Sequence, residues 1–148
     1  MAGAYVLGVD PGLSRIGLAI SDEEWLWAFP LETVKNEGEQ KVLIRIAQLI
    51  STHQVGRIVV GFPLRLDGKE GPEARRARRF RNCLAEASAL PVELWDERLT
   101  TVAAERCMRD SGVNSKKQRA RVDQAAASIL LQSYLDAKRS HESPKLQA

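Results

Sequence analysis

The chain contains few cysteines and histidines, with two of each among its 148 residues. Cys83 and Cys107 are far apart in the sequence, and neither a CxxC pair nor a His-x-x-His spacing accompanies them. This composition excludes a disulfide framework and the usual sequence patterns of a zinc site. We expect both cysteines to be buried thiols in the reducing cytoplasm.

Long apolar runs are also absent. No segment approaches the roughly 18 uninterrupted apolar residues of a membrane span. The first residues lead directly into a strand-like segment, without the basic flank and long apolar run that a signal peptide requires. We therefore expect a soluble, cytoplasmic protein with no membrane partner.

Aromatic residues are scarce, since the chain has only three Trp, two Tyr and three Phe. Neither an aromatic stacking platform nor a base-reading motif is evident, so the sequence does not distinguish DNA from RNA as a partner. The length fits one domain, which can bury about two-thirds of the surface that the unfolded chain exposes.

Positive charge is clustered, although the net charge is only +3. Five arginines fall between residues 75 and 81. A second basic run without acids consists of Lys116, Lys117, Arg119 and Arg121. Such clusters suit a polyanion such as nucleic acid, or they are solvated helix faces, and charge alone leaves both interpretations open.

The first part of the chain predicts three strands and a helix. The strands cover residues 5–9, 15–20 and 25–34, and their short connections favour an antiparallel meander. Pro30 indicates an edge position or a bulge in the third strand. Apolar residues at helical spacing then predict a helix over residues 37–52.

The rest of the chain alternates strands with helices. The β-branched run over residues 57–61 is typical of a central parallel strand that is buried on both faces. A loop rich in Gly and Pro over residues 61–71 precedes a helix over residues 72–88, and a fifth strand covers residues 92–95. A helix capped by Thr100 or Thr101 follows, and the last helix covers roughly residues 120–138.

This order of elements predicts an α/β fold of the ribonuclease H-like class. We expect a mixed five-stranded sheet flanked by helices, in which the antiparallel meander is extended by two parallel strands through right-handed crossovers. Residues 1–139 would form the single domain, and residues 140–148, which lack apolar periodicity, would form a disordered tail.

The helix over residues 72–88 is expected to turn its arginines outward. Its apolar side consists of Ala77, Phe80, Leu84 and Ala87. Arg75, Arg78 and Arg79 project from the opposite side of the same helix.

Acidic residues stand at three places where strands end or a helix begins. Asp10 ends the first strand, Asp96 and Glu97 end the last strand, and Asp123 opens the final helix. Each has an ordinary structural explanation. An Asp before Pro-Gly is a turn signal, an Asp in the first helical turn favours the helix dipole, and the acids at 96 and 97 could pair with an arginine.

Asp123 is unusual because it shares a helix stripe with apolar residues at 126, 127, 130 and 134. An unpaired buried charge costs several kcal/mol, so a partner must neutralise it. The first and last strands of such a sheet can deliver Asp10 and Glu97 to one end, and the final helix can bring Asp123 across the crevice.

Carboxylate and water oxygens suit Mg²⁺ or Mn²⁺ and do not make a zinc site. Two such ions, about 3.5 to 4 Å apart, can activate water and stabilise the leaving oxygen in phosphodiester cleavage. The three acids together therefore predict a two-metal nuclease.

Four linked motifs cover nearly the whole chain. They are GVDPG with RIGLA, then GFPL continuing through DG and EG, then WDERLTT, and finally DQAAA followed by ILLQ. In this order and spacing they resemble the YqgF/RuvX family, the bacterial Holliday junction resolvase-like proteins, also described as nucleases of precursor small-subunit ribosomal RNA. The resemblance implies a ribonuclease H-like fold and places the acidic site residues at Asp10, Glu97 and Asp123, with Asp96 as a substitute or helper for Glu97.

Two positions depart from the family pattern. Arg65-Leu66 stands in the loop where family members often have Asn. Asp10-Pro11-Gly12-Leu13 looks more like the RuvC resolvases than the more usual Asp-Val-Gly, which favours branched DNA as a substrate.

The leading hypothesis is a metal-dependent endonuclease that acts on a four-way DNA junction or on precursor ribosomal RNA. The basic residues expected to hold nucleic acid are Arg65, Arg75, Arg78, Arg79, Arg98, Lys116, Lys117, Arg119 and Arg121. Arg98 could approach the scissile phosphate, although a structural pair with Asp96 is equally consistent with the sequence.

Two other functions remain open. The actin and sugar-kinase ATPases also begin their phosphate loops with Asp-x-Gly, but they grip the nucleotide between two domains and this chain has room for one. A non-catalytic nucleic-acid-binding factor for ribosome assembly is the third reading. A resolvase that cuts symmetrically would need two active sites and hence a homodimer.

Overall fold

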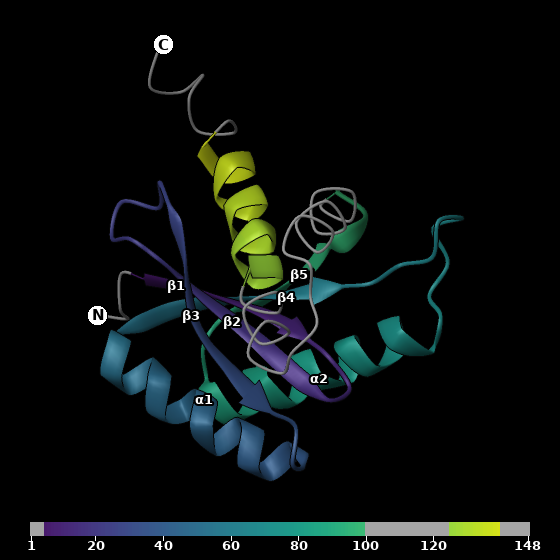
Figure 1. Ribbon diagram of the computed structural model, residues 1–148, viewed down its shortest axis with the longest axis horizontal. Helices are drawn as coiled ribbons and strands as arrows, with labels where there is room; N and C mark the ends of the chain where they lie inside the picture. Colours follow the sequence, from purple (N-terminus) through teal and green to yellow (C-terminus); the bar gives the residue numbers. More distant parts are fainter. Residues whose placement is uncertain (1–4, 100–124, 140–148) are drawn as a thin grey trace, which may run out of the picture.

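The computed structural model describes residues 5–99 and 125–139 (Figure 1). Its labelled elements are β1 (Tyr5–Pro11), β2 (Arg15–Ser21), β3 (Ala28–Lys35), α1 (Glu39–His53), β4 (Val55–Phe62), α2 (Pro72–Ser88), β5 (Val92–Asp96) and the short 3₁₀ helix η1 (Glu97–Leu99). Residues 125–139 are helical as well. No helix within these described ranges is long and apolar enough to cross a membrane.

The five strands form one mixed sheet in the order β3-β2-β1-β4-β5. β1 pairs antiparallel with β2 and parallel with β4, and β4 also pairs parallel with β5. The predicted meander, the central parallel strand and the ribonuclease H-like order of strands are all confirmed. The carboxyl ends of β1, β4 and β5 meet at one edge of the sheet.

Helices cover both faces of this sheet (Figure 1). The sheet separates two apolar cores. Alternate residues of β1 and β4 belong to different cores, because successive side chains of a strand point to opposite faces. Leu7 and Ile58 pack with α1 and α2, whereas Val6 and Val59 pack with the helix over residues 125–139. Each of these side chains is fully buried, which stabilises the fold by about 1.5–3 kcal/mol per residue.

The edge strand β3 starts later than the sequence indicates, at Ala28 instead of residue 25. The side chain of Asp22 explains the difference, since its Oδ1 accepts the backbone N–H groups of Leu26 at 2.7 Å and Trp27 at 3.0 Å. Trp25 has a φ of 60° and belongs to this turn. The predicted irregularity at Pro30 is confirmed, because the register between β2 and β3 shifts beside it.

Four smaller expectations are wrong. Asp10 does not end the first strand but pairs with Gly17 inside β1, which extends to Pro11. Ala87 is exposed, and Cys83 is only partly buried. The predicted start of the helix over residues 37–52 is two residues early.

Candidate active site

Two carboxylates meet at the edge where the parallel strands end. Asp10 lies near the end of β1, and Glu97 is the first residue of η1, directly after β5. β4 lies between these two strands, so the carboxylates approach each other across it. Their side chains lie within hydrogen-bonding reach of one another.

Gly61 of β4 makes this approach sterically feasible. A Cβ atom on Gly61 would lie only 2.2 Å from Oε1 of Glu97 and 3.0 Å from its Cδ. The carboxylate of Glu97 therefore occupies the space that any side chain at position 61 would fill. Any residue larger than glycine would have to displace it.

The environment of Glu97 opposes a negative charge. Burial, and then the charge of Asp10 and the hydrogen bond with it, raise the pKa of Glu97 to about 8. Two neighbouring carboxylates that cannot both ionise in a partly buried place require either a shared proton or a cation. The pair is therefore suited to bind a cation through oxygen ligands.

The helix over residues 125–139 packs against β1, the strand that carries Asp10. A Cβ atom on Gly8, two residues before Asp10 on the same face of β1, would lie 2.8 Å from Cβ of Leu131. Further along the helix, the amide of Gln132 binds the backbone of Leu26 and Ala28, each at 2.9 Å. Position 28 pairs with Ser21, which accepts the N–H of Val6 near the start of β1. The first described turn of the helix consequently lies at the end of β1 that carries Asp10.

Asp123, the third acid indicated by the sequence, lies outside the described residues. Within residues 5–99 and 125–139, no group of three or more His, Cys, Asp or Glu side chains is placed to hold a metal ion. The structure thus brings together two of the three expected ligands and does not test the third.

The sequence matches the family model described as "RuvX: Holliday junction resolvase" over residues 4–137. The chain belongs to the RuvX family. A relative from Chloroflexus aurantiacus is 45% identical over 136 residues, which are 92% of this chain and 89% of that protein. One from Anaeromyxobacter dehalogenans is 48% identical over 130 residues, 88% and 95% of the two chains. Both bear the name "Putative pre-16S rRNA nuclease".

Two solved structures with the same fold are those of resolvases bound to Holliday junctions. Thermus thermophilus RuvC in complex with a Holliday junction substrate superposes with a TM-score of 0.60 at 18% identity, covering 92% of this chain and 96% of RuvC. The fowlpox virus resolvase with Holliday junction DNA gives 0.54 at 14% identity, covering 90% and 97%. At these identities the likeness establishes the fold alone. Membership in RuvX, a nuclease family, comes from the sequence.

Asp96 differs from Glu97 in this RuvX protein because it is already neutralised. Arg98 donates to both of its carboxylate oxygens, from Nε at 3.1 and 3.0 Å and from Nη2 at 2.7 Å. The backbone N–H of Arg98 adds a bond of 2.9 Å to Asp96. These contacts lower the pKa of Asp96, with the Arg98 side chain as the largest cause. The pair between Asp96 and Arg98 that the sequence left open therefore exists.

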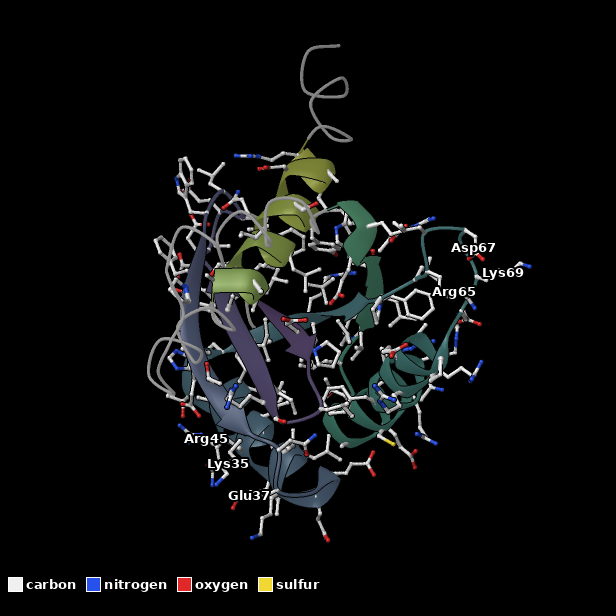
Figure 2. All side chains as sticks on the ribbon, turned by 45° about the vertical axis from the view of Figure 1, so that its right-hand side comes forward. Lys35, Glu37, Arg45, Arg65, Asp67 and Lys69 are labelled. Atoms are coloured by element: carbon white, nitrogen blue, oxygen red, sulfur yellow. The ribbon has the colours of Figure 1, made fainter. Side chains whose placement is uncertain are left out.

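Two of the expected basic residues, Arg65 and Arg78, form ion pairs with acids of the loop after β4. Arg75, Arg78 and Arg79 are exposed, as the helical pattern predicts. Arg78 donates from Nε to Glu70 at 2.9 Å and lies over the ring of Phe62. Arg65 projects with Asp67 and Lys69 from the loop after β4 (Figure 2). Lys116, Lys117, Arg119 and Arg121 lie outside the described residues.

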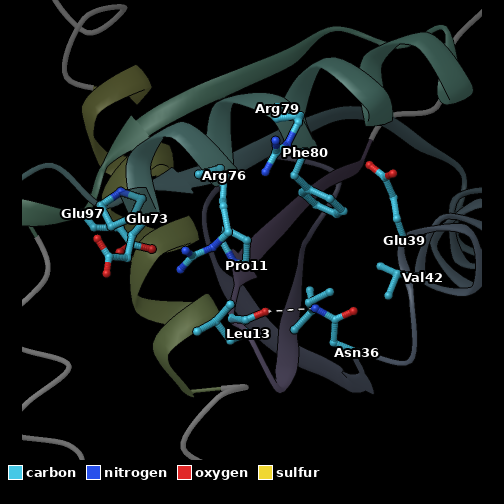
Figure 3. Close-up of a pocket in the computed structure, with 14 residues that line it drawn as sticks. Pro11, Leu13, Asn36, Glu39, Val42, Glu73, Arg76, Arg79, Phe80 and Glu97 are labelled. Carbon is cyan, nitrogen blue, oxygen red and sulfur yellow. Dashed lines mark hydrogen bonds between the residues drawn. The ribbon is translucent and has the colours of Figure 1, made fainter. Parts of the chain in front are cut away.

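A pocket of about 640 Å³ adjoins the carboxylate pair (Figure 3). Glu97 stands on its rim, and Pro11, next to Asp10, is part of its wall. α2 contributes Arg76, a residue that the sequence reasoning did not select. Arg76 lies four residues before Phe80 and therefore at the border of the apolar helix face, and that spacing could have identified it.

Proposed function

We propose that this RuvX protein is a divalent-metal-dependent endonuclease that cleaves phosphodiester bonds in structured nucleic acid. The observation that carries the proposal is the contact between Asp10 and Glu97 at the carboxyl ends of the parallel strands. Ligands of open α/β sheets bind at that edge.

The donor set fits Mg²⁺ or Mn²⁺, which prefer carboxylate oxygens. Asp10 and Glu97 would hold the metal, and we propose Asp123 as the third ligand because it precedes Ala127 by four residues in the sequence. When bound, two such ions would activate water and stabilise the leaving oxygen. Metal binding also explains why two carboxylates share a partly buried place.

The residues around the pair would hold it in a reactive arrangement. Gly61 leaves the space that the carboxylate of Glu97 occupies. Arg98 keeps Asp96 neutralised, which limits the negative charge next to Glu97. Leu131 packs on Gly8 and fixes the neighbouring part of β1. These contacts hold the ligands without substrate, as preorganised catalysis requires.

We propose a four-way DNA junction or precursor ribosomal RNA as the substrate. The curated relatives are named for the RNA reaction, and two structures with the same fold are described with Holliday junctions. Basic residues would bind the phosphates without reading sequence. The exposed candidates among the described residues are Arg65, Arg75, Arg78 and Arg79. We propose phosphate contacts also for the basic run of Lys116, Lys117, Arg119 and Arg121.

A side-by-side cleavage assay tests the nuclease function and identifies which of the two substrates is cleaved. Synthetic four-way junctions and a ribosomal RNA precursor would be incubated with wild type and Asp10→Asn, each with Mg²⁺ or Mn²⁺. We expect the wild type to cleave one of them and Asp10→Asn to bind it without cleavage. Cleavage of neither substrate, with binding retained, would support the non-catalytic assembly factor instead.

A symmetric cut of a junction would also require two active sites and hence a homodimer. Sedimentation of the complex with a junction would show two protein copies if DNA junctions are the substrate. One copy per junction would argue against symmetric resolution.

A further inference from the structure

The pocket beside the active site has the size and the walls of a binding site for a small ligand. It lies between the hairpin loop after β1, the start of α1 and one side of α2, and its volume of about 640 Å³ is typical of small-molecule sites. Glu97 belongs both to its rim and to the carboxylate pair. A ligand in the pocket would therefore lie directly beside the phosphate group on which the carboxylates act.

The inner part of the pocket is apolar. Phe80 and Val42 form its wall on the helix side, and Ile16 contributes from β2. Leu13, which is 71% exposed, lies at the opening (Figure 3). An aromatic ring and aliphatic side chains around a recess favour a flat, largely apolar group such as a nucleobase.

A cationic side chain without an acidic partner lies above this apolar part. Arg76 is partly buried and reaches from α2 toward Pro11 (Figure 3). Among the described residues it makes neither an ion pair nor a side-chain hydrogen bond, whereas Arg78 pairs with Glu70 and Arg98 with Asp96. A guanidinium in this position is suited to a phosphate group.

The rim is not uniformly basic. Glu39 of α1 and Glu73 of α2 line it at exposed positions, together with Arg76 and Arg79. Carboxylates repel an inorganic anion but accept hydrogen bonds from the N–H groups of a base. The combination of an apolar recess, the guanidinium of Arg76 and acceptors at the rim fits a nucleotide better than a free anion.

We propose that this pocket binds one unpaired nucleotide of the substrate, next to the phosphate that is cut. Its base would lie against Phe80 and Leu13, and its phosphate would contact Arg76. A base inside a duplex is stacked on both faces and cannot enter a recess, so the strand must be unpaired or distorted there. The place of this nucleotide beside the cut rests on the proposed nuclease function, whereas nucleotide binding itself does not.

Binding of single nucleotides tests the pocket without any cleavage. Methyl signals of Leu13, Ile16 and Val42 would be followed by NMR while AMP or UMP is added, with a chelator present so that no metal bridges the phosphate. We expect saturable shifts with either nucleotide, at least tenfold weaker binding in Arg76→Ala, and unchanged binding in Arg45→Ala. Arg45 is the matched control because it lies on α1, pairs with Glu32 and does not line the pocket.

Absence of methyl shifts at millimolar nucleotide would overturn the proposal. So would equal affinity in the wild type, Arg76→Ala and Arg45→Ala, or shifts of the same size with inorganic phosphate alone. Circular dichroism of Arg76→Ala verifies that the variant is folded, and Arg76→Lys should retain part of the affinity.

Cleavage of modified substrates tests the position of the nucleotide. An abasic residue directly beside the scissile phosphate should lower kcat/KM at least tenfold, while an abasic residue three positions away should have little effect. Equal rates for the two substrates would contradict the placement. If no substrate is cleaved, the nuclease proposal fails. The nucleotide titration still tests whether the pocket binds a nucleotide.

Discussion

Gly61 shapes the active site most directly, because it has no side chain. Gly61→Ala would place a methyl group 2.2 Å from Oε1 of Glu97, so the carboxylate must move. Because a misplacement of about 1 Å can cost about 100-fold in rate, we expect cleavage to fall by about 10- to 100-fold. Steady-state cleavage and Mn²⁺ affinity would measure the loss.

Gly8→Ala is the contrasting control for this substitution. Its methyl group would collide with Cβ of Leu131 at 2.8 Å, in the packing between β1 and the last helix. We expect a lower Tm in Gly8→Ala and a nearly unchanged Tm in Gly61→Ala. If Gly61→Ala instead cleaves at the wild-type rate, the carboxylate of Glu97 is not needed where the structure places it.

Glu97 should make the stability of the metal-free protein depend on pH. Its pKa is about 8 in the folded state and near 4.5 in the unfolded chain, so the folded state binds more protons between these values. The contribution of Glu97 to the free energy of unfolding is therefore fully present below about pH 4.5, falls as the pH rises and levels off above about pH 8. Thermal melts in a chelator across this range would show the fall.

Glu97→Gln removes the titrating group and should flatten this part of the profile. At about pH 8 without metal, the variant should be more stable than the wild type. Added Mn²⁺ should stabilise the wild type more at high pH than at low pH, because protons and metal compete for the same oxygens. Parallel profiles of wild type and variant would show that Glu97 ionises freely in the folded state.

At the scale of single residues, the sequence indicated the acids but could not assign their states. Asp96 and Glu97 are adjacent and chemically similar, yet Arg98 neutralises one, whereas burial and the charge of Asp10 raise the pKa of the other. That distinction depends on which way each side chain points after β5. The neighbouring charges are arranged by the tertiary fold and cannot be read from the sequence.

At the scale of elements, the C-terminal end of α2 carries avoidable strain. Ala89 caps the helix in the left-handed conformation with a φ of 58°, a place where glycine is favoured. Ala89→Gly should raise the free energy of unfolding by about 0.5–1 kcal/mol, because an L-residue pays about 1–2 kcal/mol there.

Ala87→Gly provides a control of opposite sign two residues earlier. Ala87 is exposed within α2, where glycine should lower the free energy of unfolding by about 1 kcal/mol. Urea denaturation of both variants measures the two effects. A loss of stability in Ala89→Gly would mean that the αL cap is not present in solution.

Most elements could be predicted because their apolar periodicity agrees with their final burial. β4 is a buried β-branched run, and α2 begins at the predicted proline. The exception at the start of β3 has a local cause that periodicity ignores. The side chain of Asp22 competes for the N–H groups of the aromatic segment and folds it into a turn.

At the scale of the whole molecule, the arginines on α2 should give nucleic-acid binding a strong dependence on salt. Arg79 is exposed beside the pocket, and replacing it with Ala should lower the slope of log K against log salt by about one. Binding to a four-way junction over a range of salt concentrations would measure the slope.

Arg45→Ala is the matched control for the salt experiment. Arg45 lies on α1 and donates two bonds to Glu32, at 2.7 and 2.6 Å, so we expect it to contribute no phosphate contact (Figure 2). Its loss should leave the slope unchanged. Equal slopes for all three proteins would place the nucleic acid on another face.

The order of the strands brings the site together from distant parts of the chain. β1 and β5 are separated by more than 80 positions in sequence, and β4 between them supplies the glycine that lets their acids touch. The sequence predicts this convergence because parallel strands end at a common edge. It does not reveal the pocket beside it, since the pocket depends on the distance between α2 and the hairpin loop.

The central claim is that Asp10 and Glu97 bind a divalent cation together. A Mn²⁺ titration of the wild type, Asp10→Asn and Asp136→Asn, followed by electron paramagnetic resonance, tests it most directly. Asp136 is an exposed control near the other end of the last helix. We predict saturable binding in the wild type and in Asp136→Asn, with at least about tenfold weaker binding in Asp10→Asn. Equal Mn²⁺ affinity in all three proteins would contradict the account.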